Sequence, residues 1–297
     1  MSAIEFSKDP NNFFVTYSSP HRDYSNIRDE FDNDAKEISK KHGPVYIAFS
    51  SGVDSQIIAR SFIDKKLDAE FVFLRMKNVN DVEYNQMKEC EDFFKIKVRV
   101  IEVNLEEYKN QWLEENTSNS VNCISQYPFK FLSDSLKENW PIISQGSVEP
   151  CLIGSNESNI SLYHNYYESM ELRFKLMGKS REILDFPSSA ESVASYYTDD
   201  NMKTFASTFK YFFKNTLGVE QAQMFNVYAK SFVKGQYYKK DIIWFSKLTG
   251  YEKGPDWLLQ LDYKKDTRVS VPYWELVDFL ENTRGKQKVF STWNFKT

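Results

Sequence analysis

A short run of serines with one aspartate, Ser50 to Ser55, has the residue types and spacing to bind a phosphate chain. The run follows five apolar residues and precedes a helix-like stretch, so a buried strand is expected to enter a helix through this turn. Free backbone N–H groups and the dipole at a helix start favour an anion. Gly52 lets the backbone approach a ligand closely, and the hydroxyls add donors. The alternative is an ordinary serine-rich turn, with Asp54 as a first-turn acid.

The segment Ser50-Ser51-Gly52-Val53-Asp54-Ser55 resembles the PP-loop, S-G-G-x-D-S, of the ATP pyrophosphatases. That family includes the synthetase domains of asparagine synthetase and β-lactam synthetase, GMP and NAD synthetases, and several tRNA-modifying enzymes. The resemblance implies that the loop binds the pyrophosphate of ATP while a substrate oxygen attacks the α-phosphorus. The residues it implies for that contact are Ser50, Ser51, Gly52 and Ser55. Two positions depart from the pattern. Ser51 replaces a glycine, a conservative change if its φ is negative, and Gln56 stands where Ser or Thr is common.

The resemblance also implies a magnesium site. Asn139 to Glu149 is similar to a later family strand that ends in a Gly-x-Gly-x-Asp-Glu-like turn, of which Gly146 and Glu149 remain. Gly146 is then a nucleotide contact, while Asp54 and Glu149 are the implied Mg²⁺ ligands. A hard cation between carboxylates and phosphate oxygens is the expected chemistry. The alternative for Glu149 is a solvated loop acid.

A lysine is expected near the phosphates. Asp241 to Tyr251 resembles a late family segment in which an apolar and aromatic run precedes a lysine that contacts the pyrophosphate. This implies that Lys247 is catalytic together with Asp54, because a fixed ammonium stabilises charge that develops in the transition state. The alternatives are an exposed lysine at a helix end, or Lys239 or Lys240 in that role.

Alternating strand and helix patterns would position these residues. The predicted strands are Val45–Phe49, Ala69–Met76, Val98–Val103 and Trp140–Ser144. The predicted helices are Ile27–Ile38, Gln56–Lys66, Asp81–Phe94 and Ile124–Glu138. Such alternation predicts an α/β fold with a doubly wound parallel sheet, like that of the adenine nucleotide alpha hydrolases in the resemblance. In that family, backbone near the ends of the first two strands holds adenine, which implies Ala48 and Leu74; ordinary strand core is the alternative.

The second half of the chain has mainly helical patterns, and residues 1–22 look polar and irregular. Ser188-Ser189-Ala190-Glu191 reads as a capping box that opens a helix through Tyr197. Further helical stripes run over Met202–Phe213, Ala222–Phe232 and Pro272–Glu281. We therefore expect a nucleotide-binding α/β core over residues 1–155 and a mostly helical acceptor-substrate region over 156–297, packed on that core.

Composition excludes several classes of protein. Apolar residues make up 41% and charged residues 27%, so the chain can bury a core. Thirty-eight basic against 42 acidic residues argue against sequence-independent nucleic-acid binding, although a local basic groove stays open, formed by Lys234, Lys239, Lys240 and Lys247. No apolar run approaches about 18 residues, so no membrane span is expected. Three cysteines without a CxxC pair and the lack of a signal-peptide pattern suit the cytoplasm.

The resemblance to the ATP pyrophosphatases implies an ATP-dependent ligase that forms AMP and pyrophosphate. The enzyme would use ATP and Mg²⁺ to adenylate a carboxylate or amide oxygen of an unidentified acceptor for attack by a nucleophile. It would resemble asparagine synthetase without a glutaminase domain, so ammonia would come from a separate subunit. Ser51 and Gln56 motivate an alternative, a degenerate nucleotide-binding module or subunit. A nucleobase- or tRNA-modifying enzyme is a third reading, since fold and family do not fix the second substrate.

Overall fold

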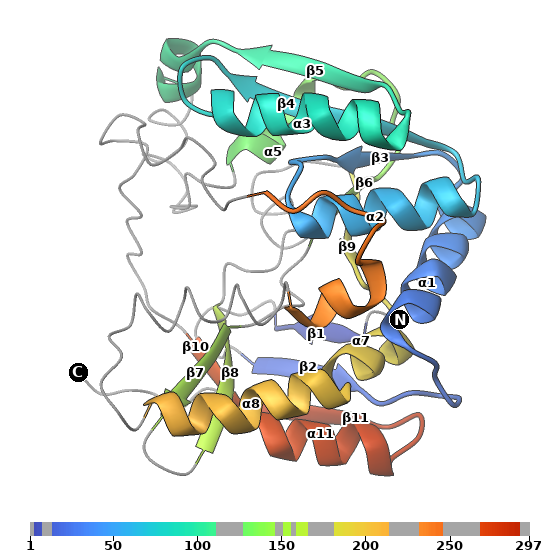
Figure 1. Cartoon of the computed structure of the whole chain (residues 1–297), viewed down its shortest axis with the longest axis vertical. Coiled ribbons are helices and arrows are strands. Elements are labelled where there is room, and N and C mark those ends of the chain that lie inside the picture. Colours follow the sequence, from blue (N-terminus) through green and yellow to red (C-terminus); the bar gives the residue numbers. More distant parts are fainter. Residues whose placement is uncertain are drawn as a thin grey trace.

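A five-stranded parallel sheet forms the upper part of the molecule in Figure 1. The structure is a computed structural model that describes residues 3–7, 14–110, 127–145, 151–155, 159–165, 181–213, 232–245 and 268–291. The sheet contains β3 (Val45–Ala48), β4 (Ala69–Met76), β5 (Val98–Val103), β6 (Ile142–Gln145) and β9 (Ile183–Phe186), in the spatial order β5-β4-β3-β6-β9. Strand order therefore reverses between β3 and β6, as in doubly wound sheets. The predicted α/β fold with a parallel sheet is confirmed.

Helices cover both faces of this sheet, so the central strand β3 is buried on both sides. Val45 and Ile47 belong to the core shared with α1 (Ile27–His42), α2 (Val53–Asp64) and α3 (Asp81–Phe94). Tyr46, which points to the other face, packs with Leu132 of α5 (Tyr127–Ser135). Successive side chains of a strand point to opposite faces, so a continuous apolar run supplies both cores.

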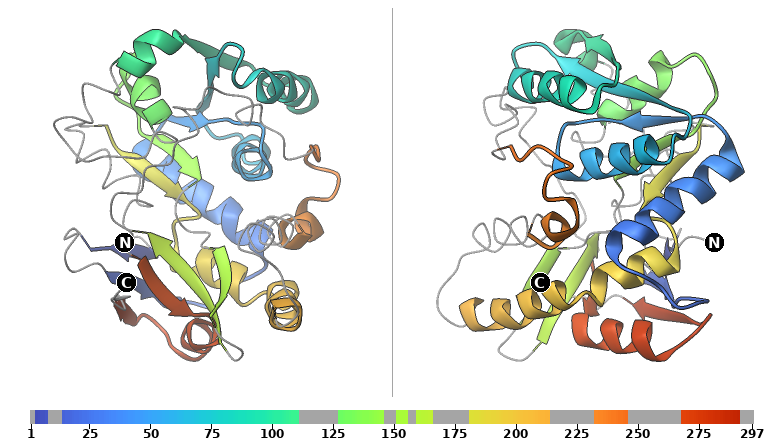
Figure 2. Two further views of the ribbon diagram at one scale, coloured as in Figure 1. Left: turned by 90° about the vertical axis from the view of Figure 1, so that its left-hand side faces the viewer. Right: turned by 45° about the vertical axis from the view of Figure 1, so that its right-hand side comes forward.

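Two small antiparallel sheets lie at the end of the molecule away from β4 and β5 (Figure 2). One has the order β1-β2-β11 and joins β1 (Ile4–Phe6) and β2 (Phe14–Ser18) to β11 (Gln287–Ser291). The other has the order β10-β8-β7, with β7 (Cys151–Ser155), β8 (Asn159–Asn165) and β10 (Arg268–Pro272).

These strands correct two expectations. Residues 14–18 form a strand where an irregular segment was expected, and the second half contains strands besides helices. In β10, Val269 and Val271 are fully buried and Ser270 lies between them, so a period of two is present but too short to stand out. The parallel sheet also takes β9 from beyond residue 155 and so crosses the expected domain boundary.

The described helices of the second half are α7 (Ala190–Tyr197), α8 (Asp200–Phe213), a helical segment at 232–238 and α11 (Tyr273–Asn282). The capping box was predicted one residue too early. The N-cap of α7 is Ser189, whose hydroxyl accepts from the Ser192 N–H at 3.1 Å. The Glu191 carboxylate instead accepts from the backbone N–H of His21 at 2.8 Å. No helix among the described residues is long and apolar enough to cross a membrane.

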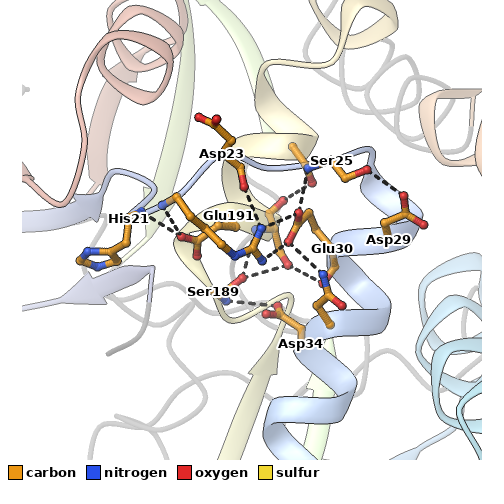
Figure 3. Close-up of polar contacts among 12 residues, drawn as sticks. His21, Asp23, Ser25, Asp29, Glu30, Asp34, Ser189 and Glu191 are labelled. Atoms are coloured by element: carbon orange, nitrogen blue, oxygen red, sulfur yellow. Dashed lines mark hydrogen bonds and ion pairs between the residues drawn. The ribbon is translucent and has the colours of Figure 1, made fainter.

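A buried polar network ties the segment before α1 to α1 and α7 (Figure 3). Glu30, 1% exposed, accepts from the Arg22 guanidinium at 2.6 and 3.0 Å and from the Ser25 N–H at 2.8 Å. Burial alone would raise the pKa of Glu30, but these bonds hold it below its ordinary value. Asp34 accepts from the Ser188 N–H at 2.6 Å, and burial raises the pKa of this carboxyl. The network fixes the position of α7 relative to α1.

Replacing Glu30 tests the strength of this network. Glu30→Gln keeps the size of the side chain but removes the charge that Arg22 binds. Hydrogen bonds to charged groups contribute about 1.5–3 kcal/mol, so we expect the free energy of unfolding at pH 7 to fall by about 2 kcal/mol in urea titrations. Because the pKa of Glu30 is lowered in the folded state, its contribution is complete above the unfolded carboxyl pKa of about 4.3 and is lost as the pH falls through the folded pKa.

The difference between Glu30→Gln and the wild type should therefore be constant near neutral pH and should shrink below about pH 4. Equal stability of the two proteins at pH 7 would contradict this role of Glu30.

Candidate functional site

The serine-rich loop, residues 49–52, joins β3 to α2 at the carboxyl end of the first strand of the parallel sheet. This is where strand order reverses, and ligands of open α/β sheets bind in the crevice at such a point. Gly52 is the N-cap of α2, and no side-chain cap bonds the first turn of the helix. The backbone N–H groups at this helix start are thus presented to an anion.

Of the motif residues, two are exposed and two are buried. Ser50 and Gly52 are exposed, whereas Ser51 and Ser55 are buried. The Ser55 hydroxyl donates to the Gly52 carbonyl at 3.0 Å, and the Ser50 hydroxyl donates to that of Ser55 at 3.4 Å. The Ser51 hydroxyl donates to the carbonyl of Glu83 in α3 at 3.4 Å. Of the three serines, only Ser50 presents its hydroxyl at an exposed position.

Ser51 does not meet the condition for a conservative change from glycine. Its φ is +61°, in the left-handed region, rather than negative. A side chain in this region costs about 1–2 kcal/mol relative to the right-handed conformation, which is why glycine is preferred there. The loop thus has the backbone of a glycine-containing turn with a serine in it.

A buried lysine forms an ion pair with Asp54, two residues after the loop. Lys234, 2% exposed and part of the helical segment 232–238, donates from Nζ to Oδ1 of Asp54 in the first turn of α2. The Asp54 side chain is 26% exposed, so the carboxylate can still be reached from solvent. Burial lowers the pKa of the Lys234 ammonium, and Asp54 opposes that decrease. Tyr196 of α7 lies against the same ammonium, with its ring centroid 5.6 Å from Nζ.

Lys234 was missed as a site residue by the sequence analysis, which considered it only for a basic groove. Lys247, Gly146 and Glu149 fall on parts of the chain that the structure does not describe. The two alternative lysines, 239 and 240, are exposed. The sequence does contain one signal, the spacing of four residues between Lys234 and Tyr238, which places both on one face of a helix. In the structure that face is buried, with Tyr238 fully enclosed.

Gln56, the other departure from the family pattern, has a fully buried carboxamide. Its Nε2 donates to the carbonyl of Ser51 at 2.7 Å and to that of Ile243 at 2.9 Å. Its Oε1 accepts from the Ile243 N–H at 2.7 Å. The amide therefore joins the loop to the segment 232–245, which passes over α2 in orange in Figure 1.

The two residues expected at adenine are partly buried and border two core clusters. Ala48, at the end of β3, packs with the cluster that contains Tyr46 and Leu132. Leu74 packs beside Met76, and its carbonyl accepts from the Asn80 side chain at 2.9 Å. Side-chain packing at these two residues does not test a backbone contact to adenine, so that contact stays a prediction.

Among the described residues, Asp54 is the carboxylate beside the phosphate-binding turn that could hold Mg²⁺ together with a ligand. Among the residues that the structure describes, no group of three or more His, Cys, Asp or Glu could bind a metal. Mg²⁺ commonly binds through one or two carboxylates plus substrate phosphates, and a partly exposed carboxylate beside a phosphate-binding turn fits that donor set.

Sequence comparisons give no assignment for this chain. No protein-family model matches it, and no curated protein matches it significantly. Similar solved structures exist at low identity. The NMN synthetase of Francisella tularensis is 12% identical with a TM-score of 0.35, and the match covers 75% of this chain and 99% of that one.

The NH3-dependent NAD synthetase of Campylobacter jejuni is 13% identical with a TM-score of 0.36, covering 74% of this chain and 98% of that one. A predicted subunit of a tRNA methyltransferase from Methanocaldococcus jannaschii is 14% identical with a TM-score of 0.29, covering 55% and 74%. Similarity at this level does not transfer an activity to the chain.

Substitutions at Ser51 test the backbone of the loop. Ser51→Gly relieves the left-handed conformation but loses a long hydrogen bond, so we expect the free energy of unfolding to change by less than about 1 kcal/mol. Ser51→Val places a β-branched residue at a positive φ in a buried position and should lower it by more than about 2 kcal/mol. Urea denaturation measures both free energies of unfolding. Equal losses of stability in the two variants would contradict the positive φ at Ser51.

Proposed function

We propose that this chain binds ATP with Mg²⁺ at the 49–52 loop and transfers the adenylyl group to an acceptor oxygen, releasing pyrophosphate. The observation that carries the proposal is the Lys234–Asp54 pair beside the motif loop at the switch point of the sheet. An exposed helix start, a carboxylate and an enclosed ammonium are the three elements that a triphosphate and its cation require.

Each residue has a distinct role in this proposal. Ser50 and the backbone of Gly52 bind the pyrophosphate part of ATP, while Asp54 contributes the protein carboxylate for Mg²⁺. The cation, when bound, neutralises charge on the phosphate oxygens. Lys234 supplies a fixed positive charge in a surrounding of low polarity, where it stabilises developing negative charge more strongly than it could in water.

The proposed reaction has two steps. An acceptor oxygen attacks the α-phosphorus, and the bond from that phosphorus to the bridging oxygen breaks, so that pyrophosphate leaves with the electron pair. A nucleophile then displaces AMP from the adenylate. The acceptor follows from residues beyond the nucleotide and not from the fold.

A nucleotide-binding module without catalysis is the second candidate. Two observations favour it: the Ser51 hydroxyl bonds to α3, and the Gln56 amide bonds to the backbone, so both groups are engaged within the protein. A nucleobase- or tRNA-modifying enzyme receives less support, because Lys234 is buried at Asp54 and does not contribute to an exposed basic groove.

Titration calorimetry with ATP and Mg²⁺ tests the proposal. The wild type should bind, Asp54→Ala should lose the magnesium-dependent part of the affinity, and Lys234→Met should weaken binding by about 10–100-fold, as expected for one charge-assisted hydrogen bond. Lys40→Met, at an exposed lysine of α1, is the matched control and should bind like the wild type.

Turnover separates the two candidates. An enzyme should release AMP and pyrophosphate when a mixture of carboxylate and amide acceptors contains its substrate, and Asp54→Ala should abolish that release. Nucleotide binding without pyrophosphate release across broad acceptor mixtures favours the module. Formation of ADP in place of AMP would contradict the adenylyl-transfer reaction.

A further inference from the structure

We propose that Gln56 is a positioning residue, whose carboxamide fixes the 232–245 segment on the 49–52 loop and thereby holds the Lys234 ammonium at Asp54. The significance of this role for ATP rests on the proposed function; the positioning itself does not. Gln56 would thus affect a bound ligand indirectly, by holding in place the lysine whose ammonium pairs with Asp54.

The first step of the argument is the way in which the carboxamide is used. Gln56 lies on α2 two residues after Asp54, and its polar atoms contact only backbone groups, at Ser51 and at Ile243. Both N–H bonds of Nε2 are donated, and Oε1 accepts. Because the amide is fully buried, a separation of the segment from the loop would leave polar groups without partners, at a cost of about 1–3 kcal/mol for each group.

The second step connects Ile243 to Lys234. The neighbour of Ile243, Trp244, packs its ring against Gly235, the neighbour of Lys234. A Cβ atom on Gly235 would lie 3.0 Å from ring atoms Cζ2 and Cη2 of Trp244. The two ends of the segment are therefore in contact, and fixing Ile243 also fixes the backbone that carries Lys234.

The third step concerns the other contacts of the segment. Arg28 of α1 binds the Asp241 carboxylate and the Tyr237 carbonyl, and the Tyr237 hydroxyl donates to Asp199. These contacts hold the segment to α1 and to the start of α8, whereas Gln56 joins it to the loop itself. If the contact between Gln56 and Ile243 were lost, the Lys234 ammonium would be affected most, because a buried charge without its carboxylate partner is strongly destabilised.

Chemical labelling tests the positioning without any nucleotide. Gln56→Met keeps the length of the side chain but cannot form the three hydrogen bonds. Acetylation of the full-length protein, followed by peptide mass spectrometry, gives the rate constant for Lys234 relative to exposed Lys239 and Lys240 on the same segment. We expect Lys234 to be protected in the wild type and to react about tenfold faster in Gln56→Met, because local opening exposes it.

Two further variants separate positioning from general loss of stability. Arg181→Met removes hydrogen bonds to the carbonyls of Glu138 and Trp140, 2.6 and 2.8 Å long, at the amino ends of the parallel strands and so at the edge opposite the loop, and should lower the melting temperature without exposing Lys234. Gln56→Leu is the second probe, and it also serves if Gln56→Met fails to fold. It too removes the three hydrogen bonds of the carboxamide, so the relative labelling of Lys234 should increase as it does in Gln56→Met.

Binding of ATP and Mg²⁺ adds the functional outcome. If Gln56 acts through Lys234, Gln56→Met should weaken binding, and the double variant with Lys234→Met should bind no more weakly than Lys234→Met alone. Unchanged relative labelling of Lys234 in Gln56→Met and in Gln56→Leu overturns the inference. If the wild type binds no nucleotide while Lys234 is exposed in Gln56→Met, the positioning role stands and the proposed function fails.

Discussion

The enclosure of the Lys234 ammonium next to Asp54 is the interaction on which the rest of the site depends. Removing an ammonium from water costs several kcal/mol even after the protein relaxes, so the 232–245 segment can occupy its place only if a carboxylate faces it. Asp54 meets that need from the first turn of α2. The ion pair consequently links the first turn of α2, next to the loop, to the 232–245 segment, which follows about 180 positions later in the chain.

The two departures from the family loop have structural uses of their own. The Ser51 hydroxyl bonds to α3, and the Gln56 amide bonds to the backbone of the loop and of Ile243. Both groups face the protein, so the face left for a ligand consists of backbone, Ser50 and the exposed side of Asp54. A phosphate-binding turn tolerates this change because most of its attraction for an anion comes from N–H groups and the helix dipole.

The buried acids near the N-terminal segment support the other side of Lys234. Tyr196, which lies against the ammonium, belongs to α7. That helix is fixed to α1 because Asp34 accepts from the N–H groups of Ser188 and Ser189, and because the Ser192 hydroxyl donates to the Glu30 carbonyl at 3.0 Å. The polar network is therefore a structural support for the site, at a distance from the loop.

The sequence by itself determined the central strands, the helices between them and the position of the loop. Residues 45–48 form the strand that their apolar run predicts, because burial on both faces of a parallel sheet favours a continuous run. Only the tertiary structure decided the sign of φ at Ser51, the short strands at the chain ends and the partner of Asp54. Local patterns report neighbouring residues, whereas Lys234 lies 180 positions from Asp54 and meets it only because the packed fold encloses both.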